Sequence, residues 1–371
     1  MEKRQERIPI NGTFELTARC NLCCEMCLIR IDHQRMQELG GRERTAVEWI
    51  SMAEELSRAG TIGLLLTGGE PMLRPDFSRI YEAIAQMGFM ITVYTNATLI
   101  TSEVMEVFKR LPPHRIGITI YGASPDIYQK VTGSADAYNH MLKGVRQLRQ
   151  LPSKISFRTT LVKDNYLDLT EIEELVYTID KNAEFNISRI VTKPVRGGIA
   201  NVENCRLTPE ENVSIMEKRS RENILIPFQH YLEEHPFLLE KKDESVKVRD
   251  VKSGLYGCEA GVNSFAITWD GRLIGCQMLG DCYTQPFEQG FLRAWDEFPE
   301  HVNVPPLPEP CKNCGIGCCA CPATRLAETG HMGRLPQYIC EEGKRMREME
   351  QRLLAEMKFI VKKRRDHGEN I

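Results

Sequence analysis

The sequence lacks the features that would place this chain in a membrane or on nucleic acid. Its 371 residues contain no run that approaches the ~20 consecutive apolar residues of a membrane span. The charged N-terminus leads into no apolar signal region, so we expect a cytoplasmic protein with no membrane partner. The chain also lacks an excess of charge of one sign. The chain has 48 basic and 51 acidic residues, and this balance predicts no nucleic-acid partner.

Cysteine, in contrast, is abundant. The 14 cysteines are Cys20, Cys23, Cys24, Cys27, Cys205 and nine more between Cys258 and Cys340. The cytosol keeps thiols reduced, so a disulfide framework is not expected there. Clustered thiols at short spacing indicate sites for soft metals, either zinc or iron–sulfur.

The first half of the chain alternates compact apolar runs with amphipathic helix patterns. We expect strands at residues 14–17, 62–66, 90–94, 116–120, 155–162 and 185–191. We expect helices at residues 46–59, 77–87, 104–111, 138–151 and 169–179. Strands separated by helices predict parallel pairing through right-handed crossovers, with both faces of the sheet covered. The fold class is therefore α/β, and the pattern leaves an incomplete barrel and an open sheet as alternatives.

The character of the chain changes after this region. We expect four segments: the α/β region at 1–200, a helical and charged bridge at 201–257, a small cysteine-rich domain at 258–345, and a C-terminal helix and tail at 346–371. Thr208 and Glu211 have the spacing of a capping box at the start of a helix. Residues 341–363 have apolar side chains on one side of a helix, which predicts a helix that docks on the rest of the chain.

The first cysteine cluster, residues 20–27, directly follows the first expected strand. Its four thiols could hold one structural zinc ion. Alternatively, Cys20, Cys24 and Cys27 could bind three irons of a [4Fe–4S] cluster and leave the fourth iron open for a chelating ligand. Four cysteines within eight residues wrap one tetrahedral ion poorly, because zinc pairs are usually separated by a longer loop. The spacing therefore favours the iron–sulfur cluster.

A second motif, Gly68-Gly69-Glu70, follows the second expected strand. Its glycines leave backbone polar groups exposed, and Glu70 adds a negative charge, so the turn suits the ammonium group of an amino-acid ligand. A Gly-Gly-Glu sequence alone is a common turn. Its combination with the cysteine triad at the end of the preceding strand is specific.

Together these motifs resemble those of the radical S-adenosylmethionine (radical SAM) enzymes, over residues 10–192. The resemblance implies a partial (β/α)6 TIM-like barrel, a [4Fe–4S] cluster on Cys20, Cys24 and Cys27, and an electron donor such as flavodoxin or ferredoxin. It also implies residues that contact S-adenosylmethionine: Met26, Gly68, Gly69, Glu70, Asn96, Thr119, Arg158, Ile190 and Val191. Cys23 has no role in this pattern, and no catalytic acid or base is identified.

The later cysteines resemble the SPASM extension of peptide-modifying radical SAM enzymes, over residues 258–340. Residues 268–274 have the pattern of a β-hairpin with an Asp-Gly turn. The resemblance implies one or two auxiliary [4Fe–4S] clusters, with two zinc sites as the alternative. The ligands would be drawn from Cys258, Cys276, Cys282, Cys311, Cys314, Cys318, Cys319, Cys321 and Cys340. The spacing departs from the family at Ala320, where a cysteine is expected.

The resemblance implies an oxidoreductase that cleaves S-adenosylmethionine reductively. The 5′-deoxyadenosyl radical would then take hydrogen from a peptide or protein, so a peptide maturase is the expected function. One alternative, formylglycine formation of the sulfatase-maturase type, is weakened because Gln277 follows Cys276 where that subgroup usually has Asp. A radical SAM enzyme of a small metabolite is a second alternative. A non-catalytic iron–sulfur electron carrier is a third, but it would need no Gly-Gly-Glu turn.

Overall fold

A computed structural model describes residues 7–228, 254–280, 282–306, 309–312, 314 and 321–366. Two of the expected ligands, Cys318 and Cys319, lie outside the described residues, as does Ala320. The chain forms two compact units. The barrel unit comprises Met1–Arg206, Lys252–Pro305 and Pro322–Met332. The helical unit comprises Leu207–Val251, Pro306–Cys321 and Gly333–Ile371.

The barrel unit is built on one sheet with the strand order β6-β5-β4-β3-β2-β1-β7-β8-β9. Its strands are β1 (Asn11–Glu15), β2 (Gly63–Thr67), β3 (Met90–Thr95), β4 (Arg115–Thr119), β5 (Lys154–Thr160), β6 (Glu184–Ser188), β7 (Ser264–Ile267), β8 (Leu273–Ile274) and β9 (Tyr283–Thr284). The first six strands pair in parallel in chain order, which confirms the predicted α/β partial barrel.

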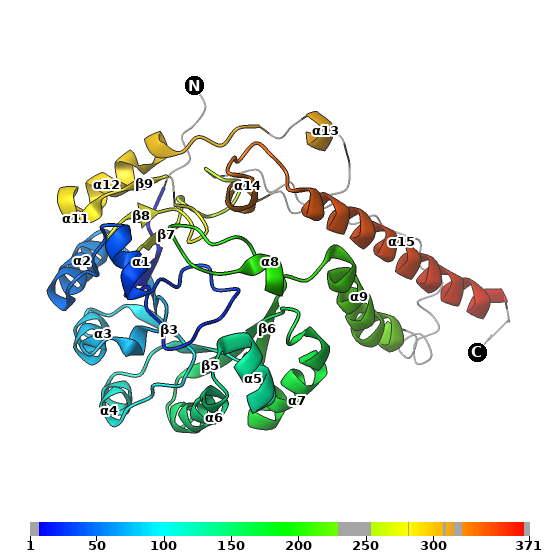
Figure 1. Ribbon diagram of the computed structural model, residues 1–371, viewed down its shortest axis with the longest axis horizontal. Helices are drawn as coiled ribbons and strands as arrows, with labels where there is room; N and C mark the ends of the chain where they lie inside the picture. Colours follow the sequence, from blue (N-terminus) through cyan, green and yellow to red (C-terminus); the bar gives the residue numbers. More distant parts are fainter. Residues whose placement is uncertain are drawn as a thin grey trace. The chain divides into compact units, whose positions relative to one another are not determined.

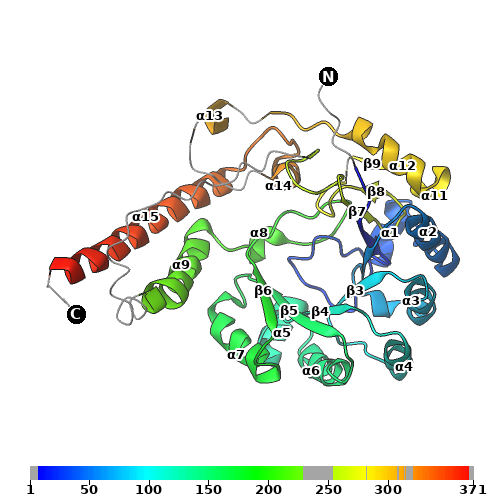
Figure 2. The ribbon, with the colours of Figure 1, turned by 180° about the vertical axis from the view of Figure 1, so that it is seen from behind.

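Helices follow the strands and surround the sheet on its outer side (Figure 1; Figure 2 from behind). The helices of the barrel unit are α1 (His33–Glu38), α2 (Ala46–Arg58), α3 (Phe77–Ala85), α4 (Ser102–Arg110), α5 (Pro125–Thr132), α6 (Asp136–Leu148), α7 (Leu169–Ile179), α8 (Val202–Cys205), α11 (Pro286–Gln289), α12 (Phe291–Glu297) and α14 (Pro322–Thr329). Short 3₁₀ turns lie at Pro71–Leu73, Tyr166–Asp168 and Phe298–His301.

The strands and helices expected within residues 10–192 all form, with shifted ends, and this range contains two further helices, α1 and α5, that were not predicted. α1 has only six residues, too few for a clear periodic pattern. α5 begins after the Ser124 cap with Pro125 in its first turn, and it ends at Gly133 in the left-handed conformation. The first strand ends at Glu15 and not at Thr17, because the next residues bond to the turn after β2.

The pleat of the strands separates an outer face from an inner face. Phe14 of β1 packs against Trp49 of α2, with ring centroids 4.7 Å apart, so this side of the sheet faces the helices. The neighbouring residue, Glu15, therefore points into the barrel. Side chains in register along parallel strands share a face, so Thr67, beside Glu15, also lies on the inner side. The barrel interior thus carries buried polar side chains.

The sheet continues past β1 into the cysteine-rich region. β7 pairs in parallel with β1, and β8 returns antiparallel to β7, which confirms the predicted hairpin. Thr268 stabilises the turn by accepting a hydrogen bond from the backbone N–H of Arg272, and Gly271 adopts a positive φ of 94°. The first part of the predicted auxiliary region is therefore continuous with the barrel sheet.

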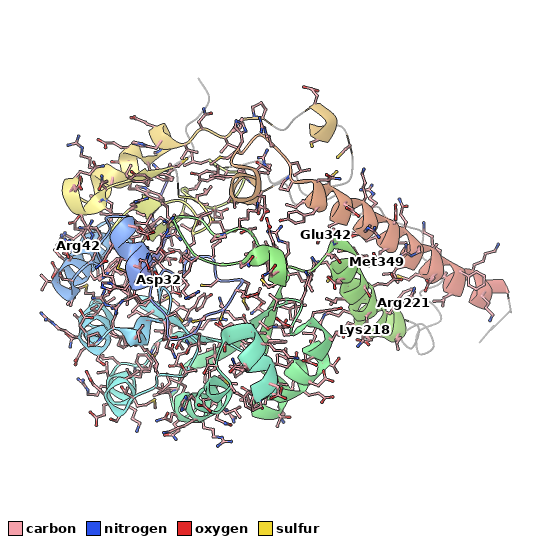
Figure 3. All side chains as sticks on the ribbon, in the orientation of Figure 1. Asp32, Arg42, Lys218, Arg221, Glu342 and Met349 are labelled. Atoms are coloured by element: carbon pink, nitrogen blue, oxygen red, sulfur yellow. The ribbon has the colours of Figure 1, made fainter. Side chains whose placement is uncertain are left out.

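The helical unit contains α9 (Pro209–Ser220), a π-helical turn at Arg221–Leu225, α13 (Glu309–Lys312) and α15 (Gln337–Asp366). α9 begins with the predicted capping box, and α15 is the predicted C-terminal helix (Figure 3). Arg221 forms a bidentate ion pair with Glu356, and Met349 of α15 is 3% exposed. Among the described residues, no helix is both long and apolar enough to span a membrane.

Candidate cluster and cofactor site

The first cysteine cluster lies in a loop that leaves the carboxyl end of β1. The loop is closed at its base, where Ile31 donates its backbone N–H to the carbonyl of Ala18 over 3.1 Å. These two residues form a buried group with Met36 of α1 and Trp269 of the hairpin turn. The loop is therefore anchored by apolar contacts from two sides, while its thiols lie between the anchor points.

Gly68 and Gly69 allow the turn after β2 to approach this loop closely. Gly69 donates its N–H to the Thr17 carbonyl at 2.7 Å, and Glu70 donates to the Arg19 carbonyl at 2.9 Å. A Cβ on Gly69 would lie 2.1 Å from the Arg19 carbonyl oxygen, and one on Gly68 would lie 2.2 Å from that of Thr17. The glycines thus hold the backbone that leads into the first cysteine.

The Glu70 carboxylate connects this turn to the end of β3. It is fully buried and accepts hydrogen bonds from the backbone N–H groups of Met72 (3.1 Å) and Asn96 (2.8 Å) and from the Thr95 hydroxyl (2.9 Å). Burial raises the pKa of Glu70 to about 7, against the opposing effect of these bonds. Ala97 takes a left-handed φ of 58°, a conformation that favours glycine.

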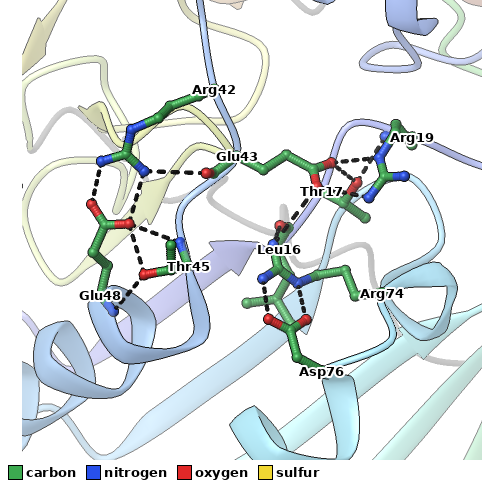
Figure 4. A network of polar contacts seen from close by, with 9 residues as sticks. All are labelled: Leu16, Thr17, Arg19, Arg42, Glu43, Thr45, Glu48, Arg74 and Asp76. Carbon is green, nitrogen blue, oxygen red and sulfur yellow. Dashed lines mark hydrogen bonds and ion pairs between the residues drawn. The ribbon is translucent and has the colours of Figure 1, made fainter.

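A network of charged side chains holds residues 16–19, the segment that leads from β1 into the cysteine loop (Figure 4). Arg19 donates two hydrogen bonds to Glu43, at 2.9 and 2.8 Å, and Thr17 donates its hydroxyl to the same carboxylate. Arg74 is 6% exposed, pairs with Asp76 and donates to the Leu16 carbonyl at 2.9 Å. The residues before the first cysteine are therefore fixed on both sides.

The thiols of the predicted triad lie close enough to interact electrostatically. The Cys20 sulfur accepts hydrogen bonds from the Leu22 N–H at 3.4 Å and from the Asn96 side-chain amide at 3.8 Å. Burial raises the pKa of Cys20 to about 12 and also raises the pKa of Cys24, whose sulfur contacts the Tyr121 hydroxyl. Thiols this buried become thiolates when a metal centre takes up the negative charge.

Cys27 completes this donor set, and Cys23 stands apart from it. Burial raises the pKa of Cys27, as for the other two thiols. Cys23 is exposed, and its sulfur accepts a hydrogen bond from Arg30 at 3.8 Å. Among the described residues, no three His, Cys, Asp or Glu side chains are grouped tightly enough to hold one metal ion. Cys20, Cys24 and Cys27 lie within electrostatic range of one another, so the three thiols fit the ligand set of a [4Fe–4S] cluster.

Arg158 of β5 presents a positive charge to the barrel interior. Its guanidinium carbon lies 3.4 Å from the ring centroid of Tyr94, and its Nε is buried with no hydrogen-bond partner. Gly117 makes room for this stack, because its Cβ would lie 2.6 Å from the Tyr94 ring. Thr119 is the register partner of Arg158 on the neighbouring strand. This arrangement can bind a carboxylate.

Two further predicted cofactor contacts, Met26 and Val191, belong to one apolar group. Val191 is 5% exposed, and Met26 packs against its group, which also includes Cys205, a buried thiol. The neighbouring residue Ile190 is 61% exposed and is not part of this group. The structure thus brings Met26 and Val191 together and separates Ile190 from them.

Three predicted auxiliary ligands gather in the barrel unit around Tyr256. Burial raises the pKa of Tyr256, and the thiols of Cys282, Cys276 and Cys258, which lie within electrostatic range of its hydroxyl, raise it further. Cys282 is 8% exposed, and Cys258 lies at the surface. The predicted ligands of the helical unit are Cys311, Cys314, Cys321 and Cys340.

The comparison with known families agrees with this site. The model of the radical SAM superfamily matches residues 14–176, which contain the cysteine triad and the Gly-Gly-Glu turn. Residues 14–176 of this chain therefore form a radical SAM domain. The chain is an enzyme that uses a [4Fe–4S] cluster and S-adenosylmethionine.

The relatives that this chain resembles in sequence are named for different activities. The chain is 25% identical to an AdoMet-dependent heme synthase of Methanosarcina barkeri, over 90% of this chain and 97% of the relative. It is 27% identical to a PqqA peptide cyclase of Rhodopseudomonas palustris, over 47% of this chain and 45% of the relative. The first likeness therefore includes the cysteine-rich region, whereas the second spans about half of each chain.

Solved structures share the fold over most of the chain. The structure titled native anSMEcpe with bound AdoMet and Cp18Cys peptide covers 95% of this chain and 99% of its own, with a TM-score of 0.66 and 15% identity. SuiB of Streptococcus suis bound to S-adenosylmethionine covers 90% of this chain and 75% of its own, with a TM-score of 0.62 and 15% identity. At this identity the likeness shows the fold alone.

Proposed function

We propose that this radical SAM enzyme modifies a residue in a peptide or protein. The observation that carries the proposal is the continuation of the barrel sheet into the cysteine-rich hairpin, with Cys258, Cys276 and Cys282 gathered around Tyr256. That arrangement agrees with the resemblance to the SPASM extension and supports an auxiliary [4Fe–4S] cluster. The fold shared with the structures of anSMEcpe and SuiB bound to peptides is compatible with such a substrate.

The cluster that starts the reaction would be held by Cys20, Cys24 and Cys27. When bound, it supplies the electron that cleaves S-adenosylmethionine and yields a 5′-deoxyadenosyl radical able to take hydrogen from a C–H bond. The chain positions the reactants: the Gly-Gly-Glu turn fixes the cysteine loop, and Arg158 with Thr119 binds the carboxylate of the methionine part. Met26 and Val191 offer the adenine an apolar surface.

Formylglycine formation of the sulfatase-maturase type is less well supported. The amide of Gln277, at the position where that subgroup usually has an Asp base, donates a hydrogen bond to Glu15 at 3.1 Å. This side chain carries no basic group and is already engaged. A peptide modification that needs no base at this position therefore agrees better with the structure.

A second candidate is the oxidation of a tetrapyrrole side chain. It is favoured by the likeness to the Methanosarcina heme synthase, which extends over 97% of that relative. A relative named Fe-coproporphyrin III synthase, also from Methanosarcina barkeri, is 23% identical over 76% of this chain and 74% of its own. That name gives Fe-coproporphyrin III as the product of the second relative, and a heme synthase must act on an iron porphyrin that precedes heme. Fe-coproporphyrin III is therefore the second substrate to test.

The test is anaerobic incubation of the reduced, reconstituted enzyme with S-adenosylmethionine and each candidate substrate. Peptides encoded beside the gene and Fe-coproporphyrin III are compared by mass spectrometry. A loss of two hydrogens from a peptide supports the proposal, provided it disappears in the Cys20→Ala, Cys24→Ala, Cys27→Ala triple variant. The Cys23→Ala variant is the matched control and should keep full activity. A mass change on Fe-coproporphyrin III alone would favour the second candidate.

A further inference from the structure

A buried ion pair joins β1 to the segment that follows β6. Arg196 contacts Glu15 through two bonds, Nη1 to Oε2 at 2.5 Å and Nη2 to Oε1 at 2.9 Å. The side chain of Arg196 is 5% exposed and that of Glu15 is fully buried. Because both charges are taken out of water, such a pair is often no more stabilising than apolar residues of the same volume. Fold stability alone is therefore a weak explanation for it.

The backbone around Arg196 is also adapted to this contact. Arg196 takes a left-handed φ of 57°, which is costly for a residue with a side chain. Gly280 leaves space for its aliphatic stem, because a Cβ at Gly280 would lie 2.6 Å from the Arg196 Cγ. Strain of this kind persists where the surrounding structure enforces it, and it tends to occur at functional sites.

The pair extends to the segment that follows Cys276. Arg196 Nη2 donates to the backbone carbonyl of Gln277 at 2.8 Å, and the Gln277 amide donates back to Glu15 at 3.1 Å. The turn itself is closed by a hydrogen bond from the Leu279 N–H to the Cys276 carbonyl at 2.8 Å. Removing the guanidinium would leave, of these contacts, just the bond from the Gln277 amide to Glu15 to join the turn to β1.

The two ends of the pair lie near different predicted cluster ligands. The Glu15 carboxylate lies within electrostatic range of the Cys27 thiol, in the radical SAM loop. The Arg196 guanidinium lies within electrostatic range of the Cys276 thiol, in the auxiliary region. In a buried site, where water screens little, each charge acts strongly on its neighbour.

We infer that Arg196 and Glu15 form a positioning element shared by the radical SAM site and the auxiliary site. It holds the Cys276 turn against β1 and places opposite charges beside the two sets of cysteine ligands. The inference rests on the proposed function, because it requires the auxiliary cluster at Cys276. A positive charge near a cluster favours its reduced state and a negative charge disfavours it, so each residue should influence the reduction potential of its own neighbour.

The test measures cluster potentials by redox titration with electron paramagnetic resonance. In Arg196→Gln, the auxiliary midpoint potential should become more negative, or auxiliary iron should be lost. In Glu15→Gln, the midpoint potential of the radical SAM cluster should become more positive. Arg196→Lys keeps the charge and should return the auxiliary potential toward that of the wild type. Arg206→Gln, which breaks another buried pair with Glu328, is the matched control and should shift neither potential.

Two outcomes separate this inference from the proposed function. If the variant without Cys20, Cys24 and Cys27 binds no iron, the auxiliary cluster is absent and the proposed function itself fails. If that variant binds iron but Arg196→Gln leaves auxiliary iron and potential unchanged, only the inference is overturned. Should Arg196→Gln fail to fold, as judged by tryptophan fluorescence, Arg196→Lys and Glu15→Gln decide the question by the same measurements.

Discussion

Gly69→Ala is expected to disrupt the radical SAM site through its backbone alone. The added Cβ would lie 2.1 Å from the Arg19 carbonyl oxygen and 2.6 Å from its carbonyl carbon. Ordinary van der Waals contacts are at ~3.5–4 Å, so the turn after β2 must move away by roughly 1 Å or more. Both obstructing atoms belong to the backbone, and no side-chain rotation can relieve the contact.

The cost of this movement follows from the contacts that it breaks. The hydrogen bonds from Gly69 to Thr17 and from Glu70 to Arg19 contribute about 1 kcal/mol each. Overpacking of a tight site costs about 1–3 kcal/mol more. We therefore expect the free energy of unfolding to fall by about 3–5 kcal/mol, a large part of the ~5–15 kcal/mol of a typical domain.

The assay uses the natural fluorescence of the barrel unit, which contains all three tryptophans, Trp49, Trp269 and Trp295. Urea titration under anaerobic conditions gives the stability, and iron analysis gives the occupancy of the cluster site. Gly63→Ala, at the first residue of β2, is the matched control. Its Cβ would meet only the end of the exposed Asn11 side chain, which can rotate away, so we expect a change within about 0.5 kcal/mol.

The outcome of this comparison bears directly on the role of the glycine. If Gly69→Ala unfolds within 1 kcal/mol of the wild type and binds as much iron, the close approach of the two backbones is not needed. If both glycine variants lose the same stability, the effect belongs to β2 as a strand and not to the turn that supports the cysteine loop.

Three further predictions concern the buried carboxylate, the interior cation and the C-terminal helix. Burial raises the pKa of Glu70 from 4.5 to about 7. As the pH rises, the unfolded chain therefore releases the Glu70 carboxyl proton at a lower pH than the folded chain does. Urea titrations should therefore show stability falling by about 3 kcal/mol as pH rises from about 4.5 to 7, and Glu70→Gln should flatten the profile. Gly117→Ala should displace Arg158 and weaken S-adenosylmethionine binding roughly tenfold by anaerobic calorimetry. Met349→Ala should lower the free energy of unfolding by about 2 kcal/mol, measured by circular dichroism during urea titration. Leu354→Ala, at a position 54% exposed, should leave it nearly unchanged.

The sequence allowed the elements of the barrel to be predicted because their signals are local. The apolar residues Ile91, Val93, Ile116 and Ile118 recur at every second position and are at most 2% exposed, so one buried face of the sheet is visible as a local pattern. Capping residues such as Thr208 act within one turn and can be identified without knowledge of the fold. The ends of strands depend on distant partners, and so β1 ended two residues before its predicted end.

The parts of the site that escaped prediction depend on contacts between distant segments. Arg196 and Glu15 are 181 positions apart, and a glutamate in a strand gives no sign of its partner. Tyr121 follows the fourth strand with no motif to single it out, yet its hydroxyl contacts the buried Cys24 sulfur. The pairing of β7 with β1 likewise follows from packing, because a short hairpin pattern does not indicate which strand it joins.

The strand order explains how one loop can be supported from two directions. β1 lies between β2 and β7, and neighbouring strands are only ~4.8 Å apart. Because all three are parallel, the Gly-Gly-Glu turn after β2 and the hairpin turn after β7 lie at the same edge as the cysteine loop. Trp269 from the hairpin turn packs at the base of that loop. On the side of β2, Gly69 donates its backbone N–H to the Thr17 carbonyl, just before the first cysteine. A change in the hairpin should therefore alter the radical SAM site as well as the auxiliary site, even without contacting S-adenosylmethionine.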